Sequence, residues 1–292
     1  LLAALESGHV AGAAVAVWPE EPPVSPLVKR LVQHPRVVVT PHLGANTQEA
    51  QVNVAVDVAR QLAAFRDGEL LEHAVNVPVG DRESMAELRP FVTLAEILGC
   101  FCLQLEKDNV ERVEVDVAGQ VARRDPELIG RAVLKGLLDG VTAQAVNLVN
   151  ARLVAVERGL EVVIRTDEAA PSGYTNLVTV TTQAGTGRKI IAGTVFDGAP
   201  RIVRLRDLHI EFIPEGHVLV LSYEDRPGMV GKIGSILGRH NVNIASMHVG
   251  RRTKRGRAIV VLLLDEDVPP EVMEEVSKAV EADFARVIRL GA

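Results

Sequence analysis

The chain has 292 residues, of which 47% are hydrophobic and 24% are charged, and its formal net charge is −6. These proportions are typical of a globular protein and exclude a disordered or fibrous chain. At about 150 residues per domain, the length predicts two domains or three small ones. The acidic balance argues against a general nucleic-acid binder.

Neither a membrane anchor nor a disulfide framework is predicted. The longest uninterrupted apolar run covers residues 258–264, whereas a membrane helix needs about 20 residues. No basic start followed by an apolar stretch indicates a secretion signal. Cys100 and Cys102 are the two cysteines, and no cluster of His and Cys surrounds them. We interpret them as reduced core residues of a cytoplasmic protein and predict no metal site.

The sequence opens inside an apolar pattern. Residue 1 is a leucine, and the first methionine is Met85. Leu1, Leu2 and Leu5 have helical spacing, and no N-cap residue precedes them. We therefore expect the chain to be part of a longer one.

The first 78 residues predict the end of an α/β domain. Residues 9–18 and 36–40 are small and β-branched, which suits strands that are buried on both faces. Asn46 or Thr47 then caps a long helix, with Glu49 placed to close a capping box. The apolar face of this helix recurs at intervals of four, four and three, at Val54, Val58, Leu62 and Phe65.

Residues 79–214 predict a second domain, of the α+β class. We expect helices at 83–88 and 91–105, with Pro90 in the first turn of the second, and a helix that Asp125 and Pro126 open. Alternating valines from residue 113 to 117 indicate a half-buried strand. Further strands are predicted at 160–165, 176–183, 189–196 and 207–212, with a hairpin turn at 184–187.

Residues 215–292 predict a ferredoxin-like βαββαβ domain. The expected elements are a strand at 218–223, a helix at 229–240, strands at 243–250 and 258–264, a helix at 270–282 and a strand at 285–290. The first helix is expected to present one apolar face, formed by Val230, Ile233, Ile236 and Leu237. We also expect its glycines to bring the backbone close to the sheet, at Gly228, Gly231, Gly234 and Gly238.

The segment from Thr40 to Gly44 (TPHLG) directly follows a predicted buried strand. Open α/β sheets bind ligands at the carboxyl ends of their strands, which is where His42 lies. Glu21 lies just past the end of the preceding strand, so the two side chains meet if the strands are parallel neighbours. A carboxylate on one ring nitrogen fixes the tautomer and raises the basicity of the other nitrogen, which makes a general acid/base. A loop histidine beside an exposed acidic loop is the alternative.

Three motifs carry a resemblance to a known family: Gly12-Ala13-Ala14, Glu21-Pro22 and residues 40–50 (TPHLGANTQEA). On these, residues 1–78 resemble the end of the catalytic region of the D-2-hydroxyacid dehydrogenase family. The whole chain resembles the C-terminal portion of the long-form D-3-phosphoglycerate dehydrogenases within that family. In those proteins an intervening domain and a regulatory ACT domain follow the catalytic region.

The resemblance implies a cytoplasmic, NAD-dependent enzyme of L-serine biosynthesis. Its reaction oxidises the C2 hydroxyl of 3-phosphoglycerate to give 3-phosphohydroxypyruvate. His42 takes the place of the family's acid/base histidine, and Glu21 that of the carboxylate that orients it. Ala16, His42 and Gly44 fall beside the cofactor.

The chain departs from the family pattern in three respects. Ala16 stands where the family usually has an aspartate near the nicotinamide. No G-x-G-x-x-G motif, whose backbone amides bind a dinucleotide pyrophosphate, occurs in the 292 residues. The family's substrate-binding arginine, which precedes these segments, is also absent. We therefore expect the chain alone to be inactive.

The same resemblance implies an effector site in the ACT domain. Tyr223, Asp225 and Asn243 match positions that hold the inhibitor serine at the interface of paired ACT domains. A zwitterion needs acceptors for its ammonium and donors for its carboxylate, which these residues and the helix start at Gly228 supply. The alternative is that Asp225 caps the helix, Asn243 occupies a turn and Tyr223 is packing. We expect a homodimer through residues 215–292, because pairing covers the open sheet edge.

Two clusters of basic residues have less specific interpretations. The ACT hairpin carries Arg251, Arg252, Lys254, Arg255 and Arg257, and we favour a solvated turn over a nucleic-acid patch. The middle domain carries Arg165, Arg188, Lys189, Arg201 and Arg204, which either bind an anion or are exposed edge charges.

Our leading hypothesis is thus an α/β and α+β chain made of three parts. Residues 1–78 end a Rossmann-type dehydrogenase domain, 79–214 form the intervening domain and 215–292 the ACT domain. Small-molecule ligands are expected, with neither nucleic acid nor membrane as a partner. The rival hypotheses are a free-standing amino-acid-binding regulatory module and another ACT-tailed 2-hydroxyacid dehydrogenase.

Overall fold

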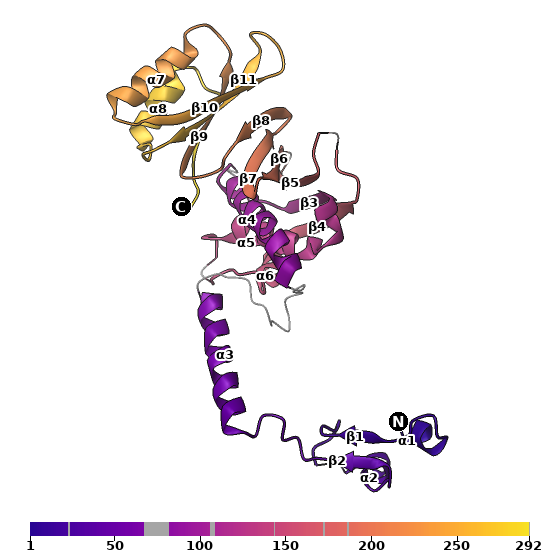
Figure 1. Cartoon of the computed structure of the whole chain (residues 1–292). Coiled ribbons are helices and arrows are strands. Elements are labelled where there is room, and N and C mark those ends of the chain that lie inside the picture. The colour runs from indigo at the N-terminus through magenta and orange to yellow at the C-terminus, as the bar shows by residue number, and fades with distance from the viewer. Residues whose placement is uncertain are drawn as a thin grey trace. The chain divides into compact units, whose positions relative to one another are not determined.

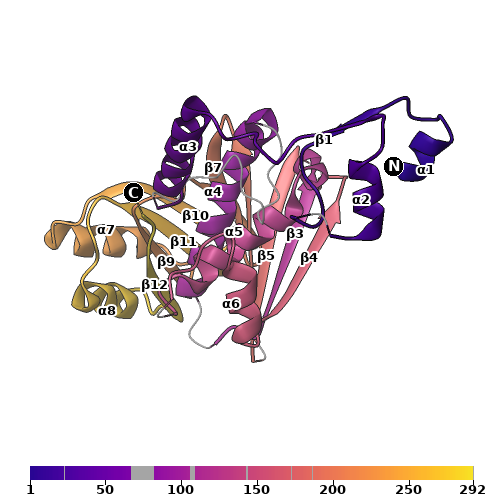
Figure 2. The same ribbon diagram turned by 90° about the horizontal axis from the view of Figure 1, so that it is seen from below.

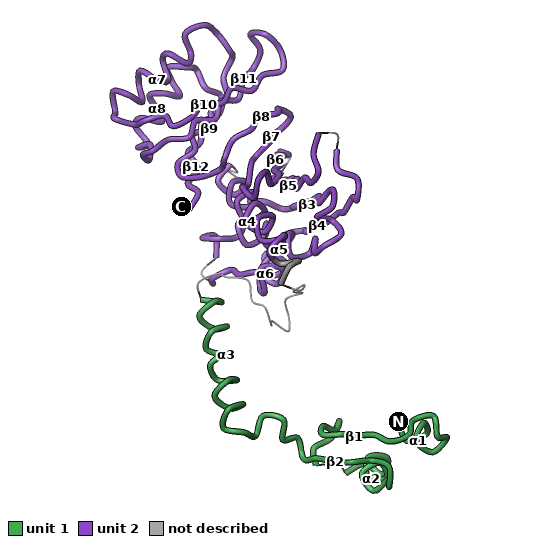
Figure 3. Tube along the Cα trace, viewed as in Figure 1, with its two compact units in different colours: residues 1–71 green, residues 72–292 purple. Residues whose placement is uncertain are grey.

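The computed structural model describes residues 1–22, 24–66, 82–105, 109–142, 144–171, 173–185 and 187–291. The chain divides into two compact units, residues 1–71 and residues 72–292, shown in Figures 1 and 3. The predicted domain boundary between residues 78 and 79 lies outside the described residues. The one between residues 214 and 215 falls between two strands of the second unit.

The first unit is built on two short parallel strands. Strand β1 (Ala13–Val15) pairs with β2 (Val37–Val39). Helix α1 (Leu2–Glu6) precedes β1 in the chain, and helix α2 (Pro26–Val32) connects β1 to β2. The hydroxyl of Ser25 caps α2 by accepting a hydrogen bond from the amide of Val28, at 3.4 Å. A small apolar cluster joins the elements, formed by Leu2, Leu5 and Leu31 with Val10, Trp18 and Val37 against it.

The expectation that both strands are long and buried on both faces is wrong. Each has three residues, Ala14 is exposed and Val38 is 66% exposed. The cluster contacts only the face that carries Val37, and no described element of the unit covers the other. The β-branched residues therefore predict the presence of the two strands correctly, but they predict the burial of the strands incorrectly.

Helix α3 (Gln48–Arg66) begins where it is predicted to begin. The hydroxyl of Thr47 accepts from the amide of Ala50 at 3.1 Å, so Thr47 rather than Asn46 provides the cap. The predicted apolar face exists in the sequence but is exposed, and within the described part of the chain no residue of α3 is buried. Its exposed members are Val54 (53%), Val58 (50%), Leu62 (65%) and Phe65 (44%).

A six-stranded sheet organises the first part of the second unit, in the order β4-β3-β5-β6-β7-β8. Its strands are β3 (Arg112–Gly119), β4 (Glu161–Asp167), β5 (Asn176–Ala184), β6 (Gly187–Phe196), β7 (Ala199–Leu205) and β8 (Leu208–Phe212). The alternation along β3 is confirmed, because Val113, Val115 and Val117 are fully buried. Strands β3 and β4 are parallel and the other neighbours are antiparallel. The tip of the β5–β6 hairpin, Thr186, lies outside the described residues.

The sequence analysis missed β7 and the helix α6 (Ala151–Glu157). Strand β7 begins with Ala199 and Pro200, and proline is depleted in strands. The available signal was the dipeptide Asp197-Gly198, which joins two strands in register. Both residues have positive φ, at 50° and 74°, as a two-residue hairpin turn with the twist of a sheet requires.

Three helices cover one face of this sheet, as Figure 2 shows: α4 (Arg82–Leu105), α5 (Pro126–Leu138) and α6. The carboxylate of Asp125 caps α5 by accepting from the amide of Leu128 at 2.9 Å, as predicted. A 3-10 turn, η1 (Gln120–Arg123), separates β3 from α5.

Helix α4 is one continuous helix, so the predicted break at Pro90 is wrong. Leu88 and Val92, on either side of the proline, are both buried, and this packing outweighs the lost backbone hydrogen bond. Two glycines let α4 and α5 touch: an ideal Cβ at Gly99 would lie 2.1 Å from the carbonyl oxygen of Val133. At Gly136 it would lie 2.0 Å from the carbonyl oxygen of Glu96.

Residues Ala86–Leu105 of α4 are long and apolar enough to cross a membrane by length and composition. In the structure this segment packs on α5 and on strands β6 and β7. Its central side chains, Leu94, Ala95, Leu98 and Phe101, are fully buried. The helix is therefore a core helix of the second unit.

The last part of the chain has the predicted βαββαβ order. Its sheet runs β10-β11-β9-β12, with all neighbours antiparallel. The elements are β9 (His217–Glu224), α7 (Met229–Arg239), β10 (Ile244–Arg251), β11 (Arg257–Leu264), α8 (Pro270–Ala279) and β12 (Phe284–Arg289). Both helices pack on one face of the sheet, where they share an apolar core with it.

The packed face of α7 differs from the prediction. Val230 is 52% exposed, and Met229 takes its place beside Ile233. No described atom lies within 4 Å of an ideal Cβ at the helix glycines, which are Gly231, Gly234 and Gly238. These glycines therefore face outward and do not bring the backbone close to the sheet.

The second face of the ACT sheet is buried as well. Val218 and Val261 are fully buried on this face, and Ser222 is 1% exposed. A small cavity there is lined jointly by Leu105, Ile190 and Leu205 of the intervening domain and by Val220, Ser222 and Ile259 of the ACT sheet. The rings of Phe212 and His248 also meet across the junction, with centroids 6.2 Å apart. The ACT sheet is thus enclosed between its own helices and the intervening domain.

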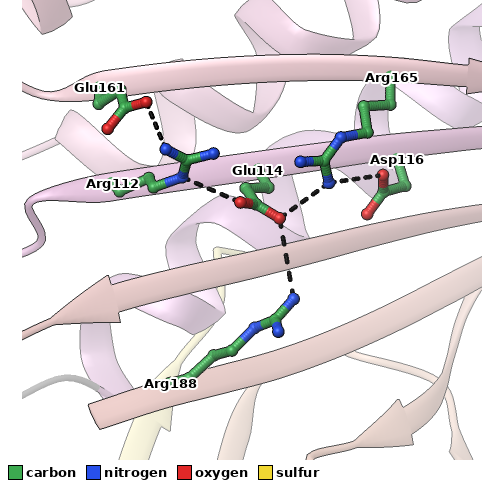
Figure 4. A network of polar contacts seen from close by, with 6 residues as sticks. All are labelled: Arg112, Glu114, Asp116, Glu161, Arg165 and Arg188. Atoms are coloured by element: carbon green, nitrogen blue, oxygen red, sulfur yellow. Dashed lines mark hydrogen bonds and ion pairs between the residues drawn. The ribbon is translucent and has the colours of Figure 1, made fainter. Parts of the chain in front are cut away.

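A network of charged side chains lies on the sheet face opposite α5 (Figure 4). Its centre is Glu114, whose side chain is 15% exposed. Its Oε1 accepts from Nε of Arg112 at 2.9 Å, and its Oε2 accepts from Nη1 of Arg165 at 2.9 Å. The guanidinium of Arg188 lies 3.7 Å from the same Oε2. The bond from Arg165, followed by that from Arg112, lowers the pKa of Glu114.

We expect E114Q to lower the free energy of unfolding by about 1–3 kcal/mol at neutral pH, because three guanidiniums lose their shared carboxylate. The matched control is E168Q, since the pair between Glu168 and Arg123 is exposed and contributes about 0–1 kcal/mol. Denaturant unfolding measures both differences.

The pH dependence gives a second check. A lowered folded-state pKa stabilises the protein above the unfolded value of about 4.3, and this contribution is lost as the pH falls through the folded value. The difference between wild type and E114Q should therefore shrink under acid. A difference that stays constant across this range would contradict the account.

Candidate functional site

The parallel pairing of β1 and β2 brings two loops together at the carboxyl ends of both strands. The amide of Thr40 donates to the carbonyl of Val15 at 3.2 Å, and that of His42 donates to the carbonyl of Ala16 at 3.0 Å. His42 has a φ of 34°, in the left-handed region, so its backbone turns back toward the first strand. The predicted condition for the meeting of Glu21 and His42 is therefore fulfilled.

Glu21 and His42 are in contact. Oε2 of Glu21 lies 3.2 Å from Nδ1 of His42, and Oε1 accepts from the amide of Trp18 at 3.3 Å. The bond to His42, followed by that from Trp18, lowers the pKa of Glu21. Both side chains are partly open, with 44% of Glu21 and 59% of His42 exposed. With Nδ1–H directed at the carboxylate, Nε2 is the free nitrogen that can exchange a proton with a ligand.

The residues beside His42 leave the strand ends open to solvent. Ala16 and Gly44 are exposed beside His42, and no described atom lies within 4 Å of an ideal Cβ at Gly44. The glycine-rich loop that would bind the pyrophosphate does not occur in the sequence. Among the described residues, no three His, Cys, Asp or Glu side chains gather as metal ligands would.

Tyr223 and Asp225 lie together at one end of the ACT sheet. Burial, followed by the charge of Asp225, raises the pKa of Tyr223. The Tyr223 side chain is 1% exposed, and its hydroxyl has no hydrogen-bond partner among the described residues. Asp225 does not cap α7, whose N-cap is Gly228, so this part of the alternative is wrong, whereas Tyr223 does pack in the apolar core of the sheet and its helices. Its carboxylate instead forms an ion pair with Arg251.

Asn243 lies at the opposite end of the same sheet. Strand β11 pairs Leu264 with Ile244 and Ala258 with Tyr223. The two pairs are six steps apart along β11, which is roughly 20 Å at about 3.3 Å per residue. The Asn243 amide donates from Nδ2 to Asp265 at 2.6 Å. One small amino acid therefore cannot reach Asn243 and Asp225 of the same copy.

Three family models match the chain in sequence. Residues 1–44 match the D-isomer specific 2-hydroxyacid dehydrogenase NAD binding domain, and residues 87–206 match the D-3-phosphoglycerate dehydrogenase intervening domain. Residues 217–281 match the ACT domain. Together the three matched segments have the combination of domains of the D-3-phosphoglycerate dehydrogenases. The resemblance proposed from the sequence and the predicted combination of domains are thereby confirmed.

Curated relatives give the same result. The chain is 35% identical over 291 residues to a D-3-phosphoglycerate dehydrogenase of Bacillus subtilis (strain 168). This match covers 99% of the chain and 55% of the relative. It is 36% identical over 290 residues to that of Methanocaldococcus jannaschii, covering 99% and 54%. It is 38% identical over 292 residues to that of Synechocystis sp. (strain PCC 6803), covering 99% and 52%. The chain thus spans about half the length of the curated relatives it matches.

The basic clusters are largely neutralised. On the ACT hairpin, three arginines form ion pairs: Arg251 with Asp225, Arg252 with Asp207 and Arg257 with Asp283. In the intervening domain, Arg165 and Arg188 face Glu114, and Arg201 pairs with Glu211 at 3.1 Å. These pairings favour structural roles over a nucleic-acid patch.

Two partners of the site residues were not found from the sequence. The amide of Trp18 is a backbone donor, which residue identity does not reveal. Arg251 was grouped with the hairpin charges, although the antiparallel register places it at the same sheet end as Tyr223. Pairing the predicted strands through that register was the signal that would have found it.

We expect H42A to raise the pKa of Glu21 toward its ordinary value, because the largest cause of its lowering is removed. The bond from Trp18 remains and retains a smaller part of the effect. Carboxyl chemical shifts followed by NMR against pH measure this. An unchanged pKa in H42A would mean that the pair is not formed in solution.

Proposed function

We propose that the chain forms the C-terminal part of an NAD-dependent D-3-phosphoglycerate dehydrogenase that oxidises 3-phosphoglycerate to 3-phosphohydroxypyruvate in L-serine biosynthesis. The observation that carries this proposal is the contact between Glu21 and His42 at the ends of parallel strands. It stands in a chain whose three matched segments have the domain order of that family. In this proposal the domain boundaries lie near residues 78 and 214. The protein is proposed to be cytoplasmic.

In this proposal His42 handles the proton and Glu21 positions His42. As the C2–H bond of the substrate breaks, its electron pair leaves as hydride, for which NAD, when bound, is the acceptor. Nε2 of His42 accepts the proton of the C2 hydroxyl, and the O–H electron pair completes the carbonyl. Glu21 holds Nδ1–H and stabilises the imidazolium that forms.

The ACT domain supplies regulation in the same proposal. L-serine binds between two copies, because Asp225 and Asn243 lie at opposite ends of the sheet in one copy. Asp225 of one copy and the carbonyl oxygen of the Asn243 side chain of another accept from the ammonium. Amides at the start of α7 donate to the carboxylate. Arg251 must release Asp225, at least in part, when the ammonium binds.

The catalytic proposal predicts the effect of H42A in a full-length dehydrogenase that contains this chain. Turnover of 3-phosphoglycerate should fall by about 10²–10⁴-fold, because no other group accepts the hydroxyl proton. NADH absorbance measures turnover, and circular dichroism checks that the fold is intact. The 292-residue chain alone should produce no NADH. Near-normal activity of the full-length H42A enzyme would remove His42 from its role.

The regulatory proposal predicts that L-serine raises the melting temperature of the 292-residue chain. At about 100 times the dissociation constant the gain is roughly 2.7 kcal/mol, because the ligand binds only the folded state. D225A should remove most of this gain. The matched control is D283A, which breaks another aspartate–arginine pair of the same hairpin and should keep the serine response.

Two further controls belong to this measurement. D-serine should give a smaller shift, because its hydroxymethyl group points away from the contacts that L-serine makes. The shift should also weaken when the protein is diluted below its dimer dissociation constant, which light scattering gives independently. Equal serine shifts in wild type and D225A would end the assignment of the site.

A further inference from the structure

The side chain of Gln104, near the end of α4, bonds to the backbone of the ACT edge strand. Its Oε1 accepts from the amide of Arg289 at 2.8 Å, and its Nε2 donates to the carbonyl of the same residue at 2.9 Å. Strand β12 lies at the edge of the ACT sheet, with β9 on its other side. A primary amide thus takes the place that a neighbouring strand would occupy.

All the hydrogen-bonding groups of this amide are used. The second N–H of Gln104 points to Sγ of Cys100, one helical turn earlier, with Nε2 and sulfur 3.1 Å apart. Burial raises the pKa of Cys100, so the thiol stays neutral beside the amide. A carboxylate at position 104 could still accept from Arg289 N–H, but it would oppose the Arg289 carbonyl with a second acceptor. Unlike a carboxylate, the amide satisfies both backbone groups.

Helix α4 connects this contact to the chain segment that comes from the dehydrogenase unit. Helix α4 is the first described element of the second unit, so the chain connection from the dehydrogenase unit leads into its N-terminal end. Its 24 residues span about 36 Å at 1.5 Å per residue. At its C-terminal end, Nζ of Lys189 donates to the carbonyl of Leu105 at 2.9 Å. The helix therefore runs from that connection to the last strand of the ACT domain.

We propose that Gln104 is the positioning residue that couples the ACT sheet to α4, and thereby transmits effector binding toward the dehydrogenase unit. This rests on the proposed serine regulation. The apolar packing between the ACT sheet and the intervening domain fixes their separation. The two bonds to Arg289 fix the register of β12 against the helix, since apolar contacts alone are non-directional.

Hydrogen exchange in the 292-residue chain tests the contact itself. In Q104L the amide of Arg289 should exchange about tenfold faster or more, because its acceptor is lost. The amide of Leu290, which donates to the carbonyl of Gly216 at 2.9 Å, is the internal reference. Q183L is the control variant, since Gln183 is an exposed glutamine of the same domain. Unchanged exchange of Arg289 in Q104L would overturn the proposal.

Q104E tests the two-point geometry of the contact. Near neutral pH its carboxylate should open the Arg289 contact as Q104L does. Below about pH 4 the protonated side chain has one acceptor and one O–H donor, so protection should return. Charged groups near this contact include Asp267, His217 and the guanidinium of Arg289, with Lys189, Glu96 and Asp139 around the end of α4. Wild type is therefore measured at each pH. Failure of protection to return would contradict the two-point geometry.

The regulatory consequence is measured in the full-length enzyme. Q104L should keep its activity without serine and its serine-induced thermal shift, while the extent of the inhibition by serine falls about tenfold or more. Full inhibition in Q104L would overturn the coupling role. If wild type shows no thermal shift with serine, the proposed serine regulation fails and the coupling role fails with it. The exchange of Arg289 would then still decide whether the contact exists.

Discussion

The coverage of both faces of the ACT sheet is the constraint on which the regulatory half of the molecule depends. One face carries Leu219, Leu221 and Leu262 against α7 and α8, and the other carries Val218 and Val261 against the intervening domain. Each fully buried side chain of this kind contributes about 1.5–3 kcal/mol relative to exposure. The ACT domain is thus held as a layer of the second unit.

That arrangement also limits where an effector can act. With both faces covered, the accessible parts of the ACT domain are its strand ends, the outer faces of its helices and the β10 edge. The glycines of α7 face outward and Val249 of β10 is 46% exposed, and in our proposal a second copy packs against this part of the domain. A site completed by such a copy unites Asp225 and Asn243, which one chain keeps roughly 20 Å apart. In that proposal, binding of the effector requires that two copies of the chain pair.

The sequence predicts features that depend on local residue patterns. It does not predict features that depend on packing against residues far away in the chain. The alternation along β3, the Asp125 cap and the meeting of Glu21 with His42 follow from spacing and parallel pairing. The continuity of α4 through Pro90 does not, because burial on both sides of the proline maintains the helix. The contact of Gln104 with Arg289 joins residues 185 positions apart, which no local pattern can show.

The central claim is that the effector site is shared between two copies, and complementation between two variants tests it most directly. D225A and N243A should each lose the binding of L-serine measured by calorimetry. When they are mixed and allowed to exchange subunits, half of the dimers become mixed, and each mixed dimer has one intact site. Roughly a quarter of the wild-type binding capacity should therefore return. If the mixture binds no more serine than the separate variants, the two residues do not form a shared site and the account is wrong.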